Sequence, residues 1–329
     1  YMDFLRNPQP VPGDLPFSLD RLDNDVRAYL ENNDALAALP IERLQRMNPL
    51  SIGLYSMHGH DLTQAPLQFA MNNQHMNGGI EVDIWGQTSL PGCFAVGEVA
   101  GTHGVTRPGG AALNAGQVFA VRLARYIAEA GWRGESDAVE ALATGPLKQI
   151  NAVIQQALDN ASGRSLSSLR EEIQARMSDY AGFICHVDTI CPAAQEARQL
   201  LASLAHDALS IQHLAEIPGL FMWRQLTLAS AAILTMLEEY VAAGGGSRGA
   251  RIILDPQGDC LPLTRHGPLA QWRFRPEQQA DKKTKLTIQY RENKFIFQQQ
   301  SLRKLPDLKG NYFEKNWPDF LCGEIYRKQ

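Results

Sequence analysis

The stretch Gln74–Gly110 reads QHMNGGIEVDIWGQTSLPGCFAVGEVAGTHGVTRPGG, and its interpretation decides that of the whole chain. Paired glycines, a Pro-Gly turn, a short apolar run, an acidic residue, a His and Arg pair and a second glycine pair follow one another within about forty residues. This order predicts a strand, a charged residue at the end of that strand, and a helix that opens with glycines. Such a combination suits a site for a planar cofactor and a small organic acid.

The apolar run Phe94–Val96 follows the Pro91-Gly92 turn and ends at Gly97. It predicts a buried strand of an α/β sheet. Glu98 would then lie at the carboxyl end of a strand, where open sheets bind ligands, and could accept hydrogen bonds from nucleotide sugar hydroxyls. A solvated loop glutamate is the alternative interpretation.

A glycine-rich segment, Pro108–Gln117, leads into the apolar helical stretch Val118–Ile127, with the proline near the first turn. Backbone amides at such a start favour negative charge, and small side chains let a planar ring approach the backbone. A reduced flavin carries negative charge at one edge of its pyrimidine ring, so this helix start would stabilise it. A tight packing point is the alternative interpretation.

Two further residues favour a substrate site beside this helix. Arg107 can bind a carboxylate through two parallel hydrogen bonds, and His103, four positions earlier, can donate or accept a proton. Each residue type taken singly is more common as a surface residue. Their spacing next to the glycine-rich helix favours the functional interpretation.

The stretch resembles the carboxyl-terminal portion of the flavin-binding domain in the succinate dehydrogenase, fumarate reductase and L-aspartate oxidase flavoproteins. The pattern of that family is close to HYTxGG, then GLYAxGE, then HGANRLGSNSLL. Its equivalents here are 74–79, 88–98 and 103–113. The resemblance implies an FAD-dependent oxidoreductase that transfers hydride between flavin and a small, carboxylate-bearing substrate.

The resemblance also implies roles for individual residues. Glu98 would contact the ribose or ribityl hydroxyls of FAD, the backbone at Ala112 and Leu113 would face the flavin pyrimidine edge, and Arg107 would hold a substrate carboxylate. The family histidine falls on Gln74, and a neutral amide binds a carboxylate less strongly than a charged imidazole. The predicted catalytic residues are Arg107, His103, His75 and Gln74. The predicted cofactor-binding residues are Glu98, Gly97, Gly79, Gly109, Gly110, Ala112 and Leu113.

A second resemblance lies further along the chain. The family ends its helical domain with a signature like ESRGAHYRxD, and here an apolar helix up to Val241 leads into Gly246–Asp255. We therefore expect a multi-domain, α+β protein with an α/β flavin-domain segment, a helical bundle and a small β-containing region. The predicted domains are the remainder of a capping domain (1–70), the carboxyl-terminal part of the FAD-binding domain (71–128), a helical domain (129–246) and a β-containing carboxyl-terminal extension (247–329).

Periodicity supports this organisation. Apolar residues at three- and four-residue spacing predict packed helices over 147–158, 165–180, 192–209 and 225–241, with an N-cap near Ser165. Strands are predicted over 251–254, 285–290 and 294–298, the last two forming a short hairpin. The polar stretch 276–283 is expected to be a mobile loop. The aromatic residues after 312 are expected to pack mainly on their own protein, with an oligomer interface as the alternative.

Composition is that of an ordinary soluble protein, with 44% hydrophobic and 20% charged residues and a net charge of −4. The sequence shows no signal peptide, no basic tract for nucleic acid and no uninterrupted apolar run of about eighteen residues for a membrane span. A cytoplasmic location and a possible homo-oligomer are expected. The five cysteines lie far apart without a C-x-x-C pair, so reduced thiols are expected and no metal site.

One expected motif is missing from the first seventy residues. Flavoproteins of this type begin with a strand, a G-x-G-x-x-G turn and a helix that binds the pyrophosphate. The one literal match, Gly244–Gly249, follows an apolar helix instead, so these glycines are predicted to end that helix and turn the chain. We therefore expect FAD to need a further amino-terminal half, on the same protein or on a partner chain, and this chain alone to be inactive.

Two other functions stay open at this stage. The chain could be a non-catalytic fragment or subunit that serves as an assembly or binding module. It could also be an unrelated α/β enzyme that happens to carry a glycine-rich helix start.

Overall fold

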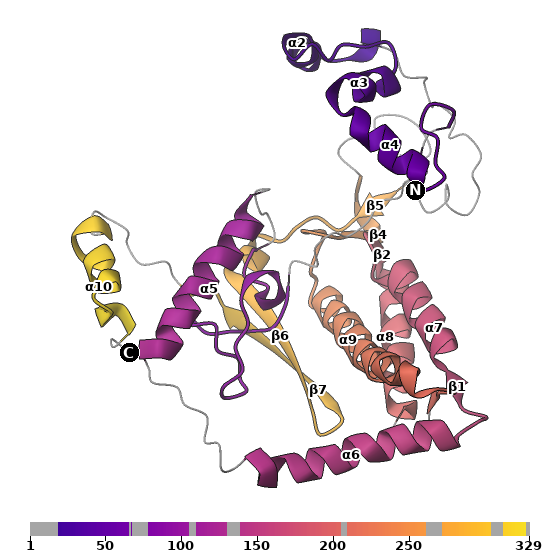
Figure 1. Ribbon diagram of the computed structural model, residues 1–329, viewed down its shortest axis with the longest axis vertical. Coiled ribbons are helices and arrows are strands. Elements are labelled where there is room, and N and C mark those ends of the chain that lie inside the picture. Colours follow the sequence, from indigo (N-terminus) through magenta and orange to yellow (C-terminus); the bar gives the residue numbers. More distant parts are fainter. Residues whose placement is uncertain are drawn as a thin grey trace. The chain divides into compact units, whose positions relative to one another are not determined.

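The computed structural model describes residues 19–65, 67, 78–104, 110–129, 139–204, 209–260, 272–303 and 312–326 (Figure 1). The chain divides into two compact units. Unit 1 comprises Tyr1–Met71 and Leu263–Ala270, and unit 2 comprises Asn72–Pro262 and Gln271–Gln329. The four domains expected from the sequence stay a prediction.

Short helices make up the described part of unit 1. They are η1 (Leu19–Arg21, a 3-10 helix), α2 (Asn24–Asn32), α3 (Pro40–Met47) and α4 (Pro49–Met57). Pro40 and Pro49 each occupy the first position of a helix. A backbone N–H at that position has no acceptor within the helix, so the N–H that proline lacks costs no helical hydrogen bond. The buried apolar side chains in the described part of unit 1 are Leu30, Ala35 and Ala37.

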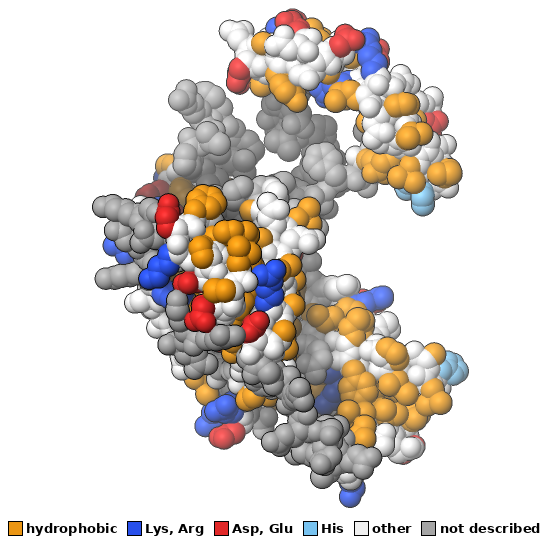
Figure 2. Space-filling model, turned by 60° about the vertical axis from the view of Figure 1, so that its left-hand side comes forward, with side chains coloured by type: hydrophobic (Ala, Val, Ile, Leu, Met, Phe, Trp, Pro, Cys, Tyr) orange, Lys and Arg blue, Asp and Glu red, His pale blue; other side chains and the backbone are white. Residues whose placement is uncertain are grey.

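Helix α4 presents apolar side chains to the solvent. None of its residues is buried, and Leu50, Leu54 and Met57 are 83%, 52% and 78% exposed. Orange apolar side chains are visible on the surface in Figure 2. A helix that is apolar on all sides is normally buried, so α4 gives unit 1 an apolar surface.

Unit 2 contains the longer helices. They are α5 (Ala111–Glu129), α6 (Val139–Asp159), α7 (Leu166–Tyr180), α8 (Val187–Ser203), α9 (Ile217–Ala242) and α10 (Trp317–Leu321). Shorter turns of helix are η2 (Gly97–Ala100), η4 (Leu214–Glu216), η6 (Gln279–Lys283), η7 (Tyr312–Asn316, a π-helix) and η8 (Glu324–Tyr326). The predicted helical region is confirmed. The Ser165 side chain caps α7, accepting a hydrogen bond from Ser168 N at 3.2 Å.

Helices α7, α8 and α9 pack side by side (Figure 1). They share two apolar clusters, one around Ile190, Ala231 and Leu234 and one around Leu169 and Leu220. Among the described residues, one helical stretch, Leu214–Ala242, is long and apolar enough to cross a membrane, with a mean hydropathy of 1.4. This stretch contains α9, whose buried residues belong to both clusters.

Within the described ranges, the strands form three small sheets. They are β1 (Arg164–Ser165), β2 (Ile184–His186), β3 (Leu209–Ser210), β4 (Ile252–Cys260), β5 (Arg273–Phe274), β6 (Thr284–Arg291) and β7 (Lys294–Ser301). β1 pairs with β3 and β2 with β4 in parallel, whereas β4–β5 and β6–β7 are antiparallel. The predicted hairpin is confirmed. Glu292 and Asn293 have φ values of 52° and 60°, as a two-residue type I′ turn requires.

The strand predicted at Phe94–Val96 is wrong. Phe94 forms a single antiparallel bridge with Gln87, and Val96 leads directly into η2. A strand needs a neighbour along its length, and the hydrogen bonds here end at Thr88 N to Cys93 O and Ala95 N to Gly86 O. The apolar run is therefore one arm of a tight turn between residues 83 and 95. The mixed helix and sheet composition is confirmed.

Candidate functional site

The paired glycines at 78 and 79 lie directly against the backbone that follows η2. Ile80 N donates to Val99 O at 2.7 Å. A Cβ on Gly79 would lie 2.3 Å from Val99 O, and a Cβ on Gly101 would lie 2.4 Å from Gly79 N. We call this approach between Gly79 and Gly101 the glycine contact. Any side chain at either position would force the two backbones apart.

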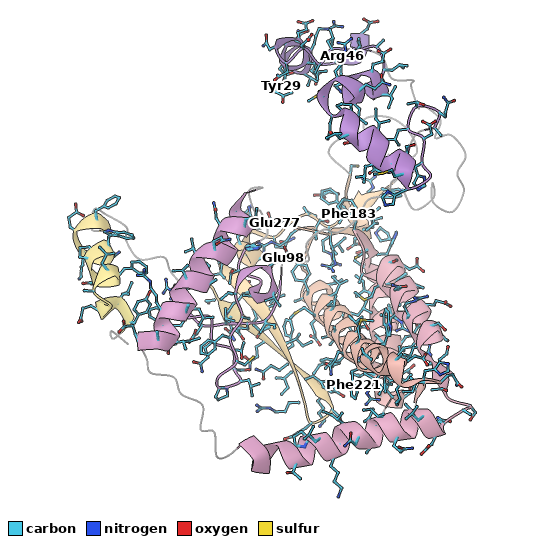
Figure 3. All side chains as sticks on the ribbon, viewed as in Figure 1. Tyr29, Arg46, Glu98, Phe183, Phe221 and Glu277 are labelled. Atoms are coloured by element: carbon cyan, nitrogen blue, oxygen red, sulfur yellow. The ribbon has the colours of Figure 1, made fainter. Side chains whose placement is uncertain are left out.

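The turn into η2 also needs a glycine. Gly97 has a φ of +74°, and its α-carbon faces Gly116 of α5, where a Cβ would lie 3.6 Å from the Gly116 α-carbon. Glu98 follows in the first turn of η2, and its side chain is exposed. Figure 3 shows Glu98 near α5, against which η2 packs. The predicted acidic ligand thus sits on a 3-10 turn instead of a strand end.

Helix α5 begins at Ala111, seven residues before the predicted apolar stretch. Gly110 is exposed, Ala112 is half-buried and Leu113 is 80% exposed. Because the first amides of a helix have no acceptor within that helix, the amides at 111–113 carry partial positive charge at this end. The helix start is therefore open to a ligand and is not packed against hydrocarbon.

A small cavity lies between the 82–86 turn, the 95–97 segment and Phe119 of α5. Its volume is about 30 Å³, which suits about one water molecule. A tricyclic ring does not fit there.

Among the predicted catalytic residues, His103 is described. It follows Gly101, whose φ is +64°, in the turn after η2. Its side chain is half-buried and its ring nitrogens are shielded from solvent. Gln74, His75, Arg107 and Gly109 lie outside the described residues, so their placement stays a prediction.

The turn after the glycine contact is held by residues that the sequence did not single out. The Asp83 carboxylate accepts hydrogen bonds from Trp85 N at 2.8 Å and Gln87 N at 3.0 Å. Trp85 stacks on Tyr126 of α5, with ring centroids 4.9 Å apart and planes at 5°. The Arg122 guanidinium lies 4.5 Å from the Trp85 ring centroid, and burial lowers the pKa of Arg122. No local sequence motif indicates that Trp85, Arg122 and Tyr126 lie together, since they come from distant parts of the chain.

The second resemblance, Gly246–Asp255, forms a structural turn. Tyr240 donates to Gly246 O at 2.8 Å and to Asp281 at 2.9 Å. A Cβ on Gly246 would lie 1.8 Å from Pro276 O. Gly244 has a φ of +87° just after α9 ends. The prediction that these glycines end the helix and turn the chain is confirmed.

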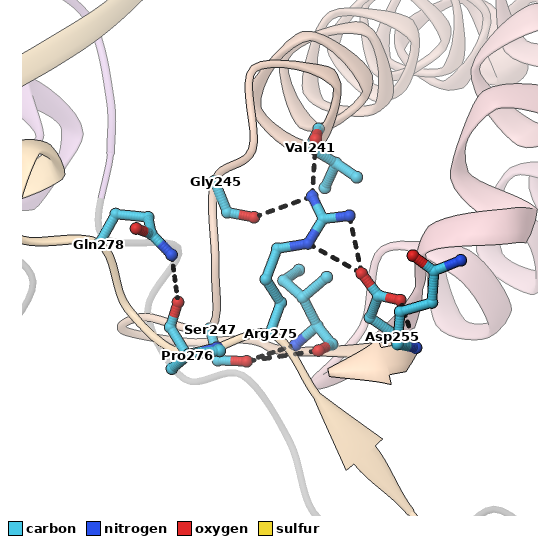
Figure 4. A network of polar contacts seen from close by, with 9 residues as sticks. Val241, Gly245, Ser247, Asp255, Arg275, Pro276 and Gln278 are labelled. Carbon is cyan, nitrogen blue, oxygen red and sulfur yellow. Dashed lines mark hydrogen bonds and ion pairs between the residues drawn. The ribbon is translucent and has the colours of Figure 1, made fainter. Parts of the chain in front are cut away.

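The Arg275 side chain forms hydrogen bonds with residues on both sides of this turn (Figure 4). Arg275 donates to Val241 O at 2.7 Å and to the Asp255 carboxylate at 2.8 and 3.1 Å. Ser247 N donates to Arg275 O at 2.7 Å. These contacts connect the end of α9 to β4 and to the segment that follows β5.

Comparison with known proteins places this geometry in context. A family model described as "FAD binding domain" matches residues 20–113. Among curated proteins, a subunit of the CoM/CoB fumarate reductase of Methanothermobacter marburgensis is 45% identical over 65 residues, covering 20% of this chain and 12% of that protein. L-aspartate oxidase of Streptomyces coelicolor is 29% identical over 186 residues, covering 56% of this chain and 31% of that protein.

Solved structures agree at the level of the fold. E. coli quinol fumarate reductase FrdA superposes with a TM-score of 0.62 at 19% identity, covering 83% of this chain and 45% of that chain. The resemblance inferred from the sequence is confirmed. The chain spans less than a third of the length of the two curated relatives and less than half of the solved chain.

Proposed function

We propose that this chain forms part of an FAD-dependent oxidoreductase of the fumarate reductase and aspartate oxidase type, acting on a small carboxylate-bearing substrate. The observation that carries the proposal is the glycine contact beside the open start of α5, within residues matched by the FAD-binding family. Only residues without side chains allow two backbones and a planar ring to converge there.

The described residues fit the cofactor. The amides at 111–113 would hold the negatively polarised pyrimidine edge, and the exposed Glu98 carboxylate would accept hydrogen bonds from sugar or ribityl hydroxyls. Gly79, Gly97, Gly109 and Gly110 would keep the backbone accessible to the ring. Bound FAD supplies a reversible acceptor and donor of hydride.

The substrate would be bound and polarised by side chains of the same segment. Arg107 would hold a substrate carboxylate through two hydrogen bonds, with Gln74 and His75 completing the anion site. His103 would exchange a proton with the substrate. A positioned donor of this kind contributes about 3 to 4 kcal/mol to the stabilisation of developing charge.

Binding of the cofactor is tested by titrating the purified chain with FAD, both alone and together with a separate polypeptide that carries a G-x-G-x-x-G strand-turn-helix, and following visible absorbance and flavin fluorescence. Removing the Glu98 carboxylate, in Glu98→Ala, should weaken FAD binding about 10- to 150-fold, because a charged hydrogen bond is worth about 1.5 to 3 kcal/mol. Glu239→Ala, which removes an exposed carboxylate from α9, is the matched control. Equal affinities of the two variants would remove Glu98 from the site.

The substrate role of Arg107 is tested separately. Arg107→Ala should lower turnover of a small dicarboxylate by about 100-fold or more while FAD affinity stays unchanged. Equal loss of both properties would show that Arg107 supports the fold instead of the substrate.

We also propose that the pyrophosphate of FAD is held by a further polypeptide segment, so that this chain alone is an assembly module. The structural use of Gly244–Gly249, which turn the chain after α9, supports this view. FAD titration is repeated with a separate polypeptide carrying a G-x-G-x-x-G strand-turn-helix. A yellow protein only with both components supports the proposal, and full FAD affinity of the chain alone contradicts it.

A further inference from the structure

The carboxyl-terminal region, which lies outside the residues matched by the FAD-binding family, contacts the segment that carries the glycine contact. Lys285 Nζ of β6 lies 2.6 Å from Glu81 Oε1, a pair separated by 204 residues in the chain. Glu81 directly follows Ile80, whose N–H donates to Val99 O. The β6–β7 hairpin packs in turn on α9, where Phe295 joins the apolar cluster. This ion pair therefore connects the helix bundle to the glycine contact.

A second contact involves Tyr326, which is 7% exposed. Its ring centroid lies 5.3 Å from that of Trp85, whose ring also stacks on Tyr126. Phe320 and Ile325 pack around the same cluster. Trp85 is thus enclosed between α5 and the carboxyl-terminal segment.

Helix α5 links this cluster to the proposed cofactor end. At a rise of about 1.5 Å per residue, Tyr126 lies about 22 Å along the helix from Ala111. Between the two ends, Gly116 faces Gly97, and the Leu123 side chain lies near Gly86. The packing of Trp85 on Tyr126 and Tyr326 therefore holds the carboxyl-terminal end of α5 against the turn between residues 83 and 95. The chain runs from this turn directly to Gly97 and Glu98.

We propose that Tyr326 and Lys285 are positioning residues for FAD: without touching the cofactor, they hold the glycine contact and the start of α5 in the arrangement that binds it. This inference rests on the FAD role proposed above. A binding site holds its ligand tightly when supporting residues fix it in advance. The carboxyl-terminal region supplies that support from two independent points.

Ring packing, and not hydrogen bonding, is the property of Tyr326 that matters. Its hydroxyl is buried and has no hydrogen-bond partner among the described residues. Tyr326→Phe removes that hydroxyl and keeps the ring, whereas Tyr326→Ala removes the ring that packs beside Trp85. Leu321→Ala shortens a 62% exposed side chain of the same segment and is the control.

The tests measure two properties of each purified variant. Hydrogen exchange of the Ile80 amide reports on the glycine contact without any cofactor. Titration with FAD in the presence of the separate G-x-G-x-x-G polypeptide then reports on binding. Tyr326→Ala should speed Ile80 exchange about tenfold and weaken FAD binding about tenfold, whereas Tyr326→Phe and Leu321→Ala should match the unchanged protein.

A charge-reversal series tests the second point of support on the surface, where unfolding of the protein is not expected. Lys285→Glu should speed Ile80 exchange and weaken FAD binding, and adding Glu81→Lys should restore both. Lys294→Glu makes the same charge change at the turn end of the hairpin and is the control.

Each outcome decides the proposal. Unchanged Ile80 exchange in both Tyr326→Ala and Lys285→Glu overturns it, as does equal damage by Tyr326→Phe and Tyr326→Ala. If Tyr326→Ala unfolds globally, judged by circular dichroism, the Lys285 series decides alone. If the unchanged protein binds no FAD even together with the G-x-G-x-x-G polypeptide, the proposed function fails, whereas the exchange measurements still show whether these residues hold the glycine contact.

Discussion

Replacing Gly101 by alanine tests the glycine contact most directly. Two separate costs add at this position. The φ of +64° is unfavourable for a residue with a Cβ, which costs about 1 to 2 kcal/mol. In addition, the new Cβ would lie 2.4 Å from Gly79 N and 2.5 Å from Gly78 C, so the backbones must separate.

Gly104 provides a matched control for the conformational cost. Its φ is +74°, and a Cβ there would meet nothing within 4 Å. Gly104→Ala therefore carries the cost of the left-handed backbone alone, partly offset by about 0.4 to 1 kcal/mol from a stiffer unfolded chain. The difference between the two variants isolates the steric part.

The steric part is large because the neighbour is backbone and not a flexible side chain. Overpacking typically costs about 1 to 3 kcal/mol, and separation of the two backbone segments also weakens the Ile80 N to Val99 O bond, worth about 1 kcal/mol. Gly101→Ala should thus be about 2 to 4 kcal/mol less stable than Gly104→Ala.

Urea unfolding of the two variants, followed by circular dichroism, measures this difference. The free energy of unfolding should fall more for Gly101→Ala, with an unchanged dependence on urea concentration. If both variants unfold at the same urea concentration, the close approach of Gly79 and Gly101 does not exist in solution, and the proposed cofactor site loses its main support.

Two further predictions concern the junction between α9 and β4. The backbone amide of Gln257 and the Arg275 guanidinium lower the pKa of Asp255. Its contribution to stability is therefore present above the unfolded-state pKa of about 3.9 and is lost as pH falls through the lower folded-state value. Unfolding between pH 7 and pH 2 should accordingly show a smaller acid loss in Asp255→Asn than in the unchanged protein, and equal acid losses would contradict the assignment. Tyr240→Phe removes the hydroxyl whose single proton lies between Gly246 O and the Asp281 carboxylate and should lower the free energy of unfolding by about 1 to 3 kcal/mol in urea titrations; the exposed Tyr29→Phe is the control.

Local features of this fold could be predicted because their causes are local. The N-cap at Ser165, the end of α9 before Gly244 and the short hairpin around 291–293 each depend on the conformational preference or hydrogen bonding of a few residues. Periodicity likewise placed the helices of the bundle. These predictions needed no knowledge of what lies across space.

Features that depend on distant partners could not be predicted in the same way. Phe94–Val96 has the composition of a buried strand, but only Gln87 pairs with it in the described chain. The stretch 276–283, expected to be a mobile loop, contains η6, because Asp281 binds Tyr240 and Arg248. In the candidate site, the glycines and Glu98 stood out in the sequence. The contribution of Tyr326 and Lys285 did not, since no spacing rule connects residues more than two hundred positions apart.

The close approach of Gly79 and Gly101 also restricts how this gene can vary. Glycine codons change by a single base into codons for alanine, valine, serine, cysteine, aspartate, glutamate, arginine or tryptophan, all of which bring a β-carbon. At Gly79 and Gly101 that carbon would lie only 2.3 and 2.4 Å, respectively, from the nearest backbone atom of the facing segment. Random mutagenesis followed by selection for soluble protein should therefore recover mostly synonymous changes at these two codons, and no substitution in the facing segment should relieve the clash, since none can make the facing backbone smaller.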